Sequence, residues 1–548
     1  MCRVRARIAL IALVLAMAGS TERIGAQKTA PTPSGGTGSY RIAGIAVDAG
    51  NGQPIGHAQI SIESEERKTA REVYATGDDG RFLFEGLAPG RYSLKAQRRG
   101  YVDQGYKMHG AYQSAVVVGP GLKTDELRFA IAPGATIMGR VVDEQGEAVR
   151  TADIVLLREV ATGRGSSLEK ASGNQTNDLG AYRFSHLMAG SYVIAVVAHP
   201  WYAGRYGVNP TGTEGMARAG DLDTDVVYPV TFYPGAMDAE SAGRIALTPG
   251  ESVTANVALA PIPGRHVTIE GAGDESDQRM NSFSAVQYVA DGIVAPMRGP
   301  IIFGNDSHTT ELIGLLPGRV DLTWTTGSGQ KSQEHFKALD LSENGNEKSG
   351  AATVVRGVLE VENGTKMSGV TVSLGYPNQR KPFTAVVGEK GEFEFREEMI
   401  RGFYSVEVPQ LTEDAVGVRA KGARASFGGI EIQPGRDVEL KITAGRAARV
   451  SGHAMRNGTT VDGALVALVP DEFNSENNLM RVDQSNSDGS FELSEVVPGK
   501  YTLIAVENGW DGDWRSAEFL GRFVNRGKRL EIGAGAGVNL EIEAEDGK

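Results

Sequence analysis

The sequence predicts an all-β protein made of four or five consecutive small β-sandwich modules. Val, Ile, Tyr and Thr alternate with polar residues over most of the 548 residues, as expected for strands with one buried face. The 72 Gly residues lie between such segments and indicate tight turns, while long apolar patterns of helical period are hard to find. A chain of this length favours several domains over one.

The N-terminus has the pattern of an export signal. Arg3, Arg5 and Arg7 precede an apolar run of about 11 residues, which is too short to span a bilayer but suits the core of a signal peptide. The alternative is a buried N-terminal helix. We expect a signal peptide over 1–26 and a flexible linker over 27–39, rich in Thr, Pro, Ser and Gly. The single cysteine, Cys2, would be removed, so the mature chain would lack disulfides.

Three short motifs then recur in a fixed order. An opening strand carries a central Gly, at 42–47, 137–142, 355–360 and 450–455. A polar turn with Gly leads into an aromatic strand, at 78–84, 178–184, 389–395 and 487–493. A Pro-Gly-type turn leads into a strand, usually with Tyr, at 87–94, 187–194, 315–322, 400–406 and 496–503. From the opening Gly to the last turn Gly the distances are 46, 51, 45 and 47 residues, which predicts a repeated sandwich of short strands.

These units resemble the carboxypeptidase regulatory-like domain, a small transthyretin-like (Ig-like) β-sandwich related in shape to starch-binding modules. The G-x-V opening, the D-x-G-x-F turn and the L-x-P-G-x-Y strand carry the resemblance. It implies an accessory module, with no activity of its own, and carbohydrate as a ligand class. We expect modules at 40–132, 133–262 with an aromatic insertion, 263–350 as a diverged copy, 351–444 and 445–548. The short connections favour a semi-rigid rod.

Catalytic motifs are missing from the sequence. The eight histidines are isolated, with no H-E-x-x-H or similar zinc pattern, and there is no G-x-S-x-G elbow, phosphate-binding loop or dinucleotide fingerprint. Asp221, Asp223 and Asp225 alternate as calcium ligands can, although a solvated loop fits them better. We therefore expect no enzyme activity, no metal and no cofactor. The net charge of -12, with both signs interspersed, argues against nucleic-acid binding.

Aromatic residues follow the last repeated strand in three modules. Those we single out as candidate ligand-binding residues are Trp201, Tyr202, Tyr206, Trp510 and Trp514. Rings on loops can stack on sugars or anchor a partner protein. The alternative is that they close the end of a sandwich or pack on the next module.

The sequence thus predicts a non-catalytic, exported, multi-module protein of the periplasm, outer surface or exterior. Its expected role is carbohydrate binding or adhesion. A scaffold that binds another cell-envelope protein is the alternative, and an unrecognised enzyme is a third. No segment of the mature chain is expected to span a membrane.

Overall fold

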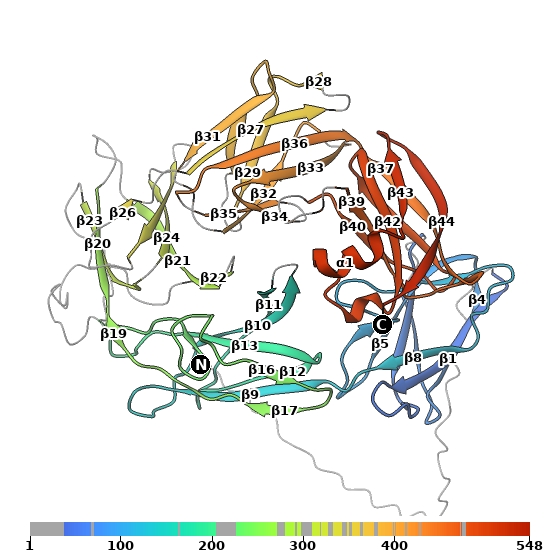
Figure 1. Ribbon diagram of the computed structural model, residues 1–548. Helices are drawn as coiled ribbons and strands as arrows, with labels where there is room; N and C mark the ends of the chain where they lie inside the picture. Colours follow the sequence, from blue (N-terminus) through green and yellow to red (C-terminus); the bar gives the residue numbers. More distant parts are fainter. Residues whose placement is uncertain are drawn as a thin grey trace, which may run out of the picture.

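The computed structural model shows a nearly all-β chain whose sandwiches follow one another along the sequence (Figure 1). This confirms the predicted fold class. The structure describes residues 38–547, and the signal-peptide prediction lies outside them. Gaps fall at 67–70, 163–164, 204–225, 271–279, 291–292, 297–308, 318, 327–332, 342–347, 350–352, 362–364, 377–381, 398, 400–401, 412–413, 427–428, 434, 472 and 474–477.

Module 1 consists of β1 (Tyr40–Asp48), β2 (Gln59–Ser64), β3 (Glu72–Ala75), β4 (Arg81–Leu87), β5 (Gly90–Gln97), β6 (Gln104–Gly105), β7 (Val116–Val118) and β8 (Leu127–Ile131). One sheet has the order β4-β1-β8 and the other β3-β2-β5-β6, with β7 also paired to β5. The first strand pairs antiparallel with β4 and parallel with the last strand, β8.

Module 2 repeats this plan with additions. Its strands are β9 (Ala135–Val142), β10 (Asp153–Thr162), β11 (Gly165–Gln175), β12 (Ala181–Leu187), β13 (Gly190–Val197), β14 (Val226–Val227), β15 (Thr231–Phe232), β16 (Ile245–Leu247), β17 (Ser252–Thr254), β18 (Val257–Ala258) and β19 (Ile262–Pro263). Here β9 pairs antiparallel with β12 and parallel with β17 and β18. The insertion between β13 and β14 carries the predicted aromatic residues.

Module 3 has a two-stranded and a five-stranded sheet, with the orders β20-β23 and β22-β21-β24-β25-β26. Its strands are β20 (Arg265–Glu270), β21 (Met280–Ala290), β22 (Ile293–Pro296), β23 (Thr309–Leu315), β24 (Arg319–Thr326), β25 (Gln333–Asp340) and β26 (Lys348–Ser349). The expectation of a diverged repeat depends on Gly271, which lies 47 residues before Gly318, and on Asp306-Ser307-His308 in place of the polar turn, and all of these lie outside the described residues.

Module 4 returns to the plan of module 1. Its strands are β27 (Thr353–Val361), β28 (Thr365–Lys366), β29 (Thr371–Gly375), β30 (Phe383–Val386), β31 (Glu392–Glu397), β32 (Gly402–Glu407), β33 (Asp414–Lys421), β34 (Arg424–Ser426), β35 (Gly429–Ile432) and β36 (Val438–Arg446). The first strand, β27, again pairs antiparallel with β31 and parallel with the last strand, β36.

Module 5 adds a helix to the same plan. Its elements are β37 (Ala448–Arg456), β38 (Thr459–Thr460), β39 (Leu465–Pro470), β40 (Arg481–Gln484), β41 (Ser490–Val496), β42 (Gly499–Glu507), the 3-10 helix η3 (Gly509–Asp511), α1 (Ala517–Val524), β43 (Lys528–Ile532) and β44 (Gly537–Asp546). Phe519, Leu520 and Phe523 of α1 bury one side of the helix against β39 and β42. The hydroxyl of Ser516 caps the helix by accepting from the Phe519 amide at 3.1 Å.

The repeated motifs have a physical explanation in these sheets. A Cβ on the opening Gly would overlap a backbone carbonyl oxygen, so only Gly allows the parallel pairing. At Gly44, Gly357 and Gly452 this oxygen belongs to the neighbouring parallel strand, and at Gly139 it belongs to Ala255, between β17 and β18. The Tyr of the last repeated strand donates its hydroxyl to the carbonyl four residues earlier. This bond is 3.0 Å long from Tyr92, 2.9 Å from Tyr192 and 2.7 Å from Tyr501. It fastens the turn to the core in three modules.

The modules do not form the expected rod. Module 1 (blue) lies against module 5 (red), so that the chain closes into a ring (Figure 1). The Ser114 hydroxyl donates to the Ser485 carbonyl at 2.8 Å, although the residues are 371 positions apart. Short connections restrict the angle between consecutive modules, but they do not fix the direction in which the chain bends. Here the successive bends bring module 1 and module 5 together. We call this contact between modules 1 and 5 the seam.

Candidate binding site

The insertion of module 2 forms a small aromatic platform over the start of that module. Trp201 is 72% exposed, although most large rings are buried. Its ring meets that of Tyr202 edge to face, with centroids 5.8 Å apart and an angle of 88° between the planes. Such a T-shaped contact fixes the orientation of an exposed ring without covering it.

A carboxylate anchors this platform. The Tyr202 hydroxyl donates to Oε1 of Glu144 at 2.5 Å, and the Tyr228 hydroxyl donates to Oε2 at 2.9 Å. Glu144 lies in the loop that follows β9, while Tyr202 and Tyr228 lie on either side of the gap at 204–225. One carboxylate therefore ties both ends of the insertion to the sandwich.

The electrostatics keep Glu144 charged and the tyrosines neutral. Partial burial acts to raise the pKa of Glu144, but the hydrogen bonds from Tyr202 and Tyr228 outweigh it and lower that pKa overall. Burial, followed by the hydrogen bond to Glu144 and its charge, raises the pKa of Tyr202 to about 12. The same causes, in the same order, raise the pKa of Tyr228. At neutral pH the platform presents an ionised carboxylate beside an exposed indole.

This arrangement has the chemistry of a sugar-binding subsite. The face of an indole packs on the C–H face of a pyranose, and a carboxylate has lone pairs left for hydroxyl donors after two tyrosines have bound it. Of the residues expected at this site, the structure brings Trp201 and Tyr202 together, while Tyr206 lies outside the described residues. Glu144 and Tyr228 are the additional members. Nothing near Glu144 in sequence points to its role, since its partners are 58 and 84 residues away.

Trp510 and Trp514 are placed differently from the expectation that they are exposed. Both are partly buried and pack against the cluster that joins α1 to β39 and β42. Nε1 of Trp510 donates to the Gly463 carbonyl at 3.1 Å. The Trp510 ring stacks on His109 of module 1, with ring centroids 5.6 Å apart and an angle of 6° between the planes, and the ring of Tyr112 contacts both tryptophans. The two rings therefore lie at the seam, against a module that is not their neighbour in sequence.

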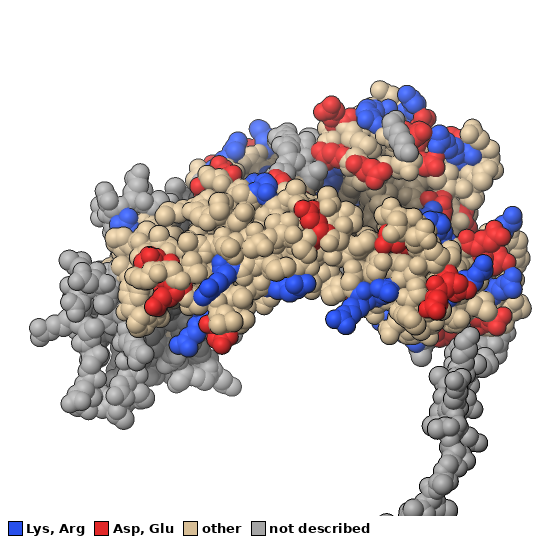
Figure 2. All heavy atoms as spheres, turned by 90° about the horizontal axis from the view of Figure 1, so that it is seen from below, with Lys and Arg blue, Asp and Glu red and all other residues tan. Residues whose placement is uncertain are grey.

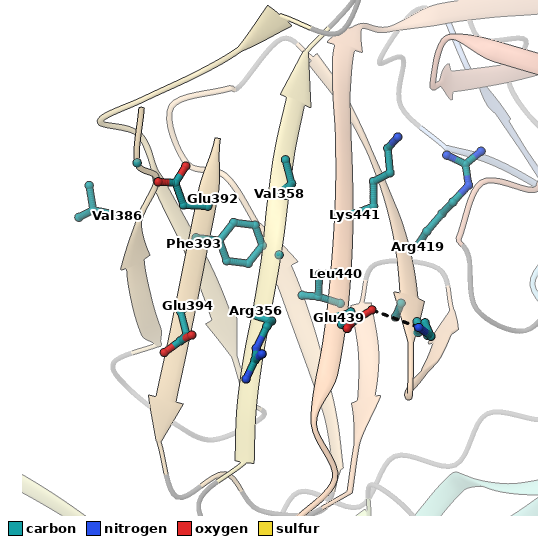
Figure 3. A pocket seen from close by; sticks show the side chains of 14 residues that line it. Arg356, Val358, Val386, Glu392, Phe393, Glu394, Arg419, Glu439, Leu440 and Lys441 are labelled. Carbon is teal, nitrogen blue, oxygen red and sulfur yellow. Dashed lines mark hydrogen bonds and ion pairs between the residues drawn. The ribbon is translucent and has the colours of Figure 1, made fainter. Parts of the chain in front are cut away.

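A groove crosses the outer face of one sheet of module 4, with a volume of about 870 Å³ (Figure 3). Five strands contribute to it, namely β31, β27, β36 and β33 and, through Val386, β30. We call it the module 4 groove; its charged lining residues are Arg356, Glu392, Glu394, Arg419, Lys421, Glu439 and Lys441.

Several charges of the groove are paired. Lys421 lies 3.4 Å from Glu439, Lys441 lies 3.0 Å from Glu360, and Arg356 lies 3.7 Å from Asp437. No Trp or Tyr is among the lining residues, and the ring of Phe393 belongs to the core of the module. The groove thus lacks the exposed aromatic surface that the platform of module 2 offers.

No metal centre emerges from the part of the chain that the structure describes. Within it, no group of three or more His, Cys, Asp and Glu side chains is arranged to hold a metal ion. Asp221, Asp223 and Asp225 lie outside it. On the face seen in Figure 2, acidic and basic residues are interspersed and neither sign gathers into a patch. Among the same described residues, no helix has the length and apolar character needed to cross a membrane.

Comparisons with known proteins identify the first module. Residues 41–130 match the family model of the carboxypeptidase regulatory-like domain, which confirms the resemblance there. No curated protein matches the chain.

The chain is also similar to several solved structures. The Bacillus anthracis TIE protein is 9% identical over 92% of this chain and 68% of that chain, with a TM-score of 0.15. A streptococcal ancillary pilin is 12% identical over 54% of this chain and 95% of the pilin chain, with a TM-score of 0.18. BcpA, the major pilin subunit of Bacillus cereus, is 10% identical over 74% of this chain and 98% of the BcpA chain, with a TM-score of 0.14. At such low TM-scores the likeness carries no argument about function.

Proposed function

We propose that this protein is exported and acts as a non-catalytic binding protein, of the carbohydrate-binding or adhesion type, with module 2 as the binding module. The observation that carries the proposal is the exposed Trp201 ring, held by Tyr202 beside the ionised carboxylate of Glu144. The basic and apolar N-terminus supports export to the periplasm, the outer surface or the exterior.

A glycan array followed by calorimetry on the best ligand tests the proposal. Stacking of a sugar on an aromatic ring contributes about 1 kcal/mol, so Trp201→Ala should weaken binding roughly fivefold. Met237→Ala is the matched control, because Met237 is a large apolar residue of the same module that is 60% exposed. Retention of full affinity by Trp201→Ala, or an equal loss in both variants, would contradict this site.

A scaffold that binds another envelope protein is the second candidate, and the module 4 groove favours it. A groove of about 870 Å³ with paired charges at its rim suits a polar protein surface better than a sugar ring. Crosslinking in the native envelope distinguishes the two functions. Under this candidate, Lys441→Glu abolishes capture of one partner protein, whereas Trp201→Ala and the surface control Lys528→Glu leave the capture unchanged.

A further inference from the structure

The seam differs in chemistry from two of the joints between consecutive modules, which share apolar clusters. Module 3 contributes Val289 and Ile293 to an apolar cluster of module 2. Between modules 4 and 5, Ala415 joins the core of module 5, and Gly417 faces Leu479. By contrast, the cores of modules 1 and 5 share no residue, and their contact consists of hydrogen bonds, ion pairs and half-exposed rings.

The hydrogen bonds of the seam run between a turn of module 5 and one edge of module 1. The amide of Ala115 donates to Oδ1 of Asn486 at 3.0 Å, and the amide of Val117 donates to the hydroxyl of Ser487 at 2.8 Å. In return, the Ser487 amide donates to the Ala115 carbonyl at 3.0 Å. The turn therefore caps backbone groups at the edge of β7 that would otherwise need water or a second strand.

Gln484 extends this contact toward the aromatic rings. Its Nε2 donates to the Lys107 carbonyl at 2.6 Å and to the Ser114 hydroxyl at 2.9 Å, and its Oε1 lies 2.9 Å from Nδ1 of His109. Lys107 also lies 2.5 Å from Asp462. One glutamine thus bonds three residues of the other module, beside the stack of His109 on Trp510.

A comparison of equivalent turns shows that this contact is specific to module 5. In module 2, Oδ1 of Asn177 accepts from the amides of Leu179 and Ala181 within its own turn. Asn486 occupies the same position before the Gly of its turn, yet its Oδ1 accepts from module 1. Asn486 still bonds within its own turn through Nδ2, which donates to the Ser490 hydroxyl at 3.1 Å, so it is the carbonyl oxygen of the side chain that is redirected to module 1.

From these contacts we propose that the seam is a latch, at which the ring of five modules opens and closes. All contacts of the seam break and form together, while modules 1 and 5 remain folded. Hydrogen bonds across a polar contact are replaced by bonds to water when it opens, whereas opening an apolar joint exposes hydrophobic surface. The seam, unlike the joints between modules 2 and 3 and between modules 4 and 5, can therefore separate without dividing a shared apolar cluster of the described residues. Opening uncovers the edge of β7 and the rings of Trp510 and Trp514.

Amide hydrogen exchange on the full chain tests the latch. The amides of Ala115, Val117 and Ser487 donate across the seam, so they should exchange together and faster than the amides of β5 and β42 in the two cores. If they exchange at the rate of the core strands, the seam opens only when a module unfolds, and the latch is refuted.

Two substitutions test whether the seam opens as one unit. Asn486→Ala and Gln484→Ala each leave the hydrogen-bond partner of the Val117 amide in place. Asn486→Ala removes one bond across the seam and should speed the exchange of that amide three- to tenfold, and Gln484→Ala, which removes three contacts, should speed it at least as much. Asn177→Ala is the matched control and should leave Val117 unchanged. If either substitution speeds only the amides that it touches, the contacts are independent and the proposal is wrong.

Discussion

The structure separates two tryptophans that the sequence places in the same class. Trp201→Ala removes a ring that is 72% exposed, and such surface changes alter stability by less than about 0.5 kcal/mol. Trp510→Ala removes a half-buried ring, the hydrogen bond to Gly463 and the stack on His109. Half of the cost of truncating a buried ring is about 2 kcal/mol, and a lost hydrogen bond adds about 1 kcal/mol. We expect a loss of about 3 kcal/mol for Trp510→Ala.

Differential scanning calorimetry of the full chain is the assay, because five modules can give separate transitions. For a domain of this size 1 kcal/mol shifts Tm by about 4–8 °C, so Trp510→Ala should lower one transition by about 12–24 °C. Trp201→Ala should leave every transition within about 4 °C of its original position. A strong shift for Trp201→Ala would make that ring part of the core, and no shift for Trp510→Ala would refute its packing at the seam.

Three other predictions concern single groups. Glu144→Gln should lower the pKa of Tyr202 from about 12 toward its ordinary value, because the neighbouring charge is lost; an ultraviolet pH titration in which wild type and variant coincide would contradict this. Tyr501→Phe removes a buried 2.7 Å hydrogen bond and should cost about 1–3 kcal/mol in urea unfolding of module 5, and an unchanged midpoint would count against the role of this hydroxyl. Gly452→Ala places a Cβ against the Leu540 carbonyl and should prevent module 5 from folding, as judged by proteolysis; a protease-resistant variant would show that the two strands can separate.

The local motifs were predictable because each has a local cause. The positive φ of Gly80 and Gly489, 72° and 80°, is what a polar turn with Gly requires. The apolar pattern of α1 was also present in the sequence, since Phe519, Leu520 and Phe523 follow the capping Ser516 at helical spacing. Eight residues are too few for that signal to stand out among aromatic loop residues, so the helix was not predicted.

The candidate site was only partly predictable, for a physical reason. An aromatic-rich insertion can be recognised from composition, but whether a ring is exposed depends on what lies opposite it. Trp510 has Tyr112 opposite it at 4.9 Å, contributed by a module about four hundred residues earlier in the sequence, whereas Trp201 contacts its neighbour in sequence, Tyr202. Trp510 stands among Gly and Asp residues and Trp201 follows His199 and Pro200, and neither local composition shows whether a ring from elsewhere lies opposite.

Closure of the ring depends on how one side chain is used rather than on which residue is present. Asn177 and Asn486 stand at equivalent positions in equivalent turns. Which amide their Oδ1 atoms accept from depends on whether an edge strand of another module comes within reach. Each module alone satisfies the local rules of a sandwich, so those rules hold equally for a rod and for a ring. What selects the ring is the sum of the angles at the joints, to which Val289 and Asn478 contribute through contacts far apart in sequence. A rod would leave Asn486, Gln484 and the edge of β7 to water, and this difference is what hydrogen exchange at Val117 measures.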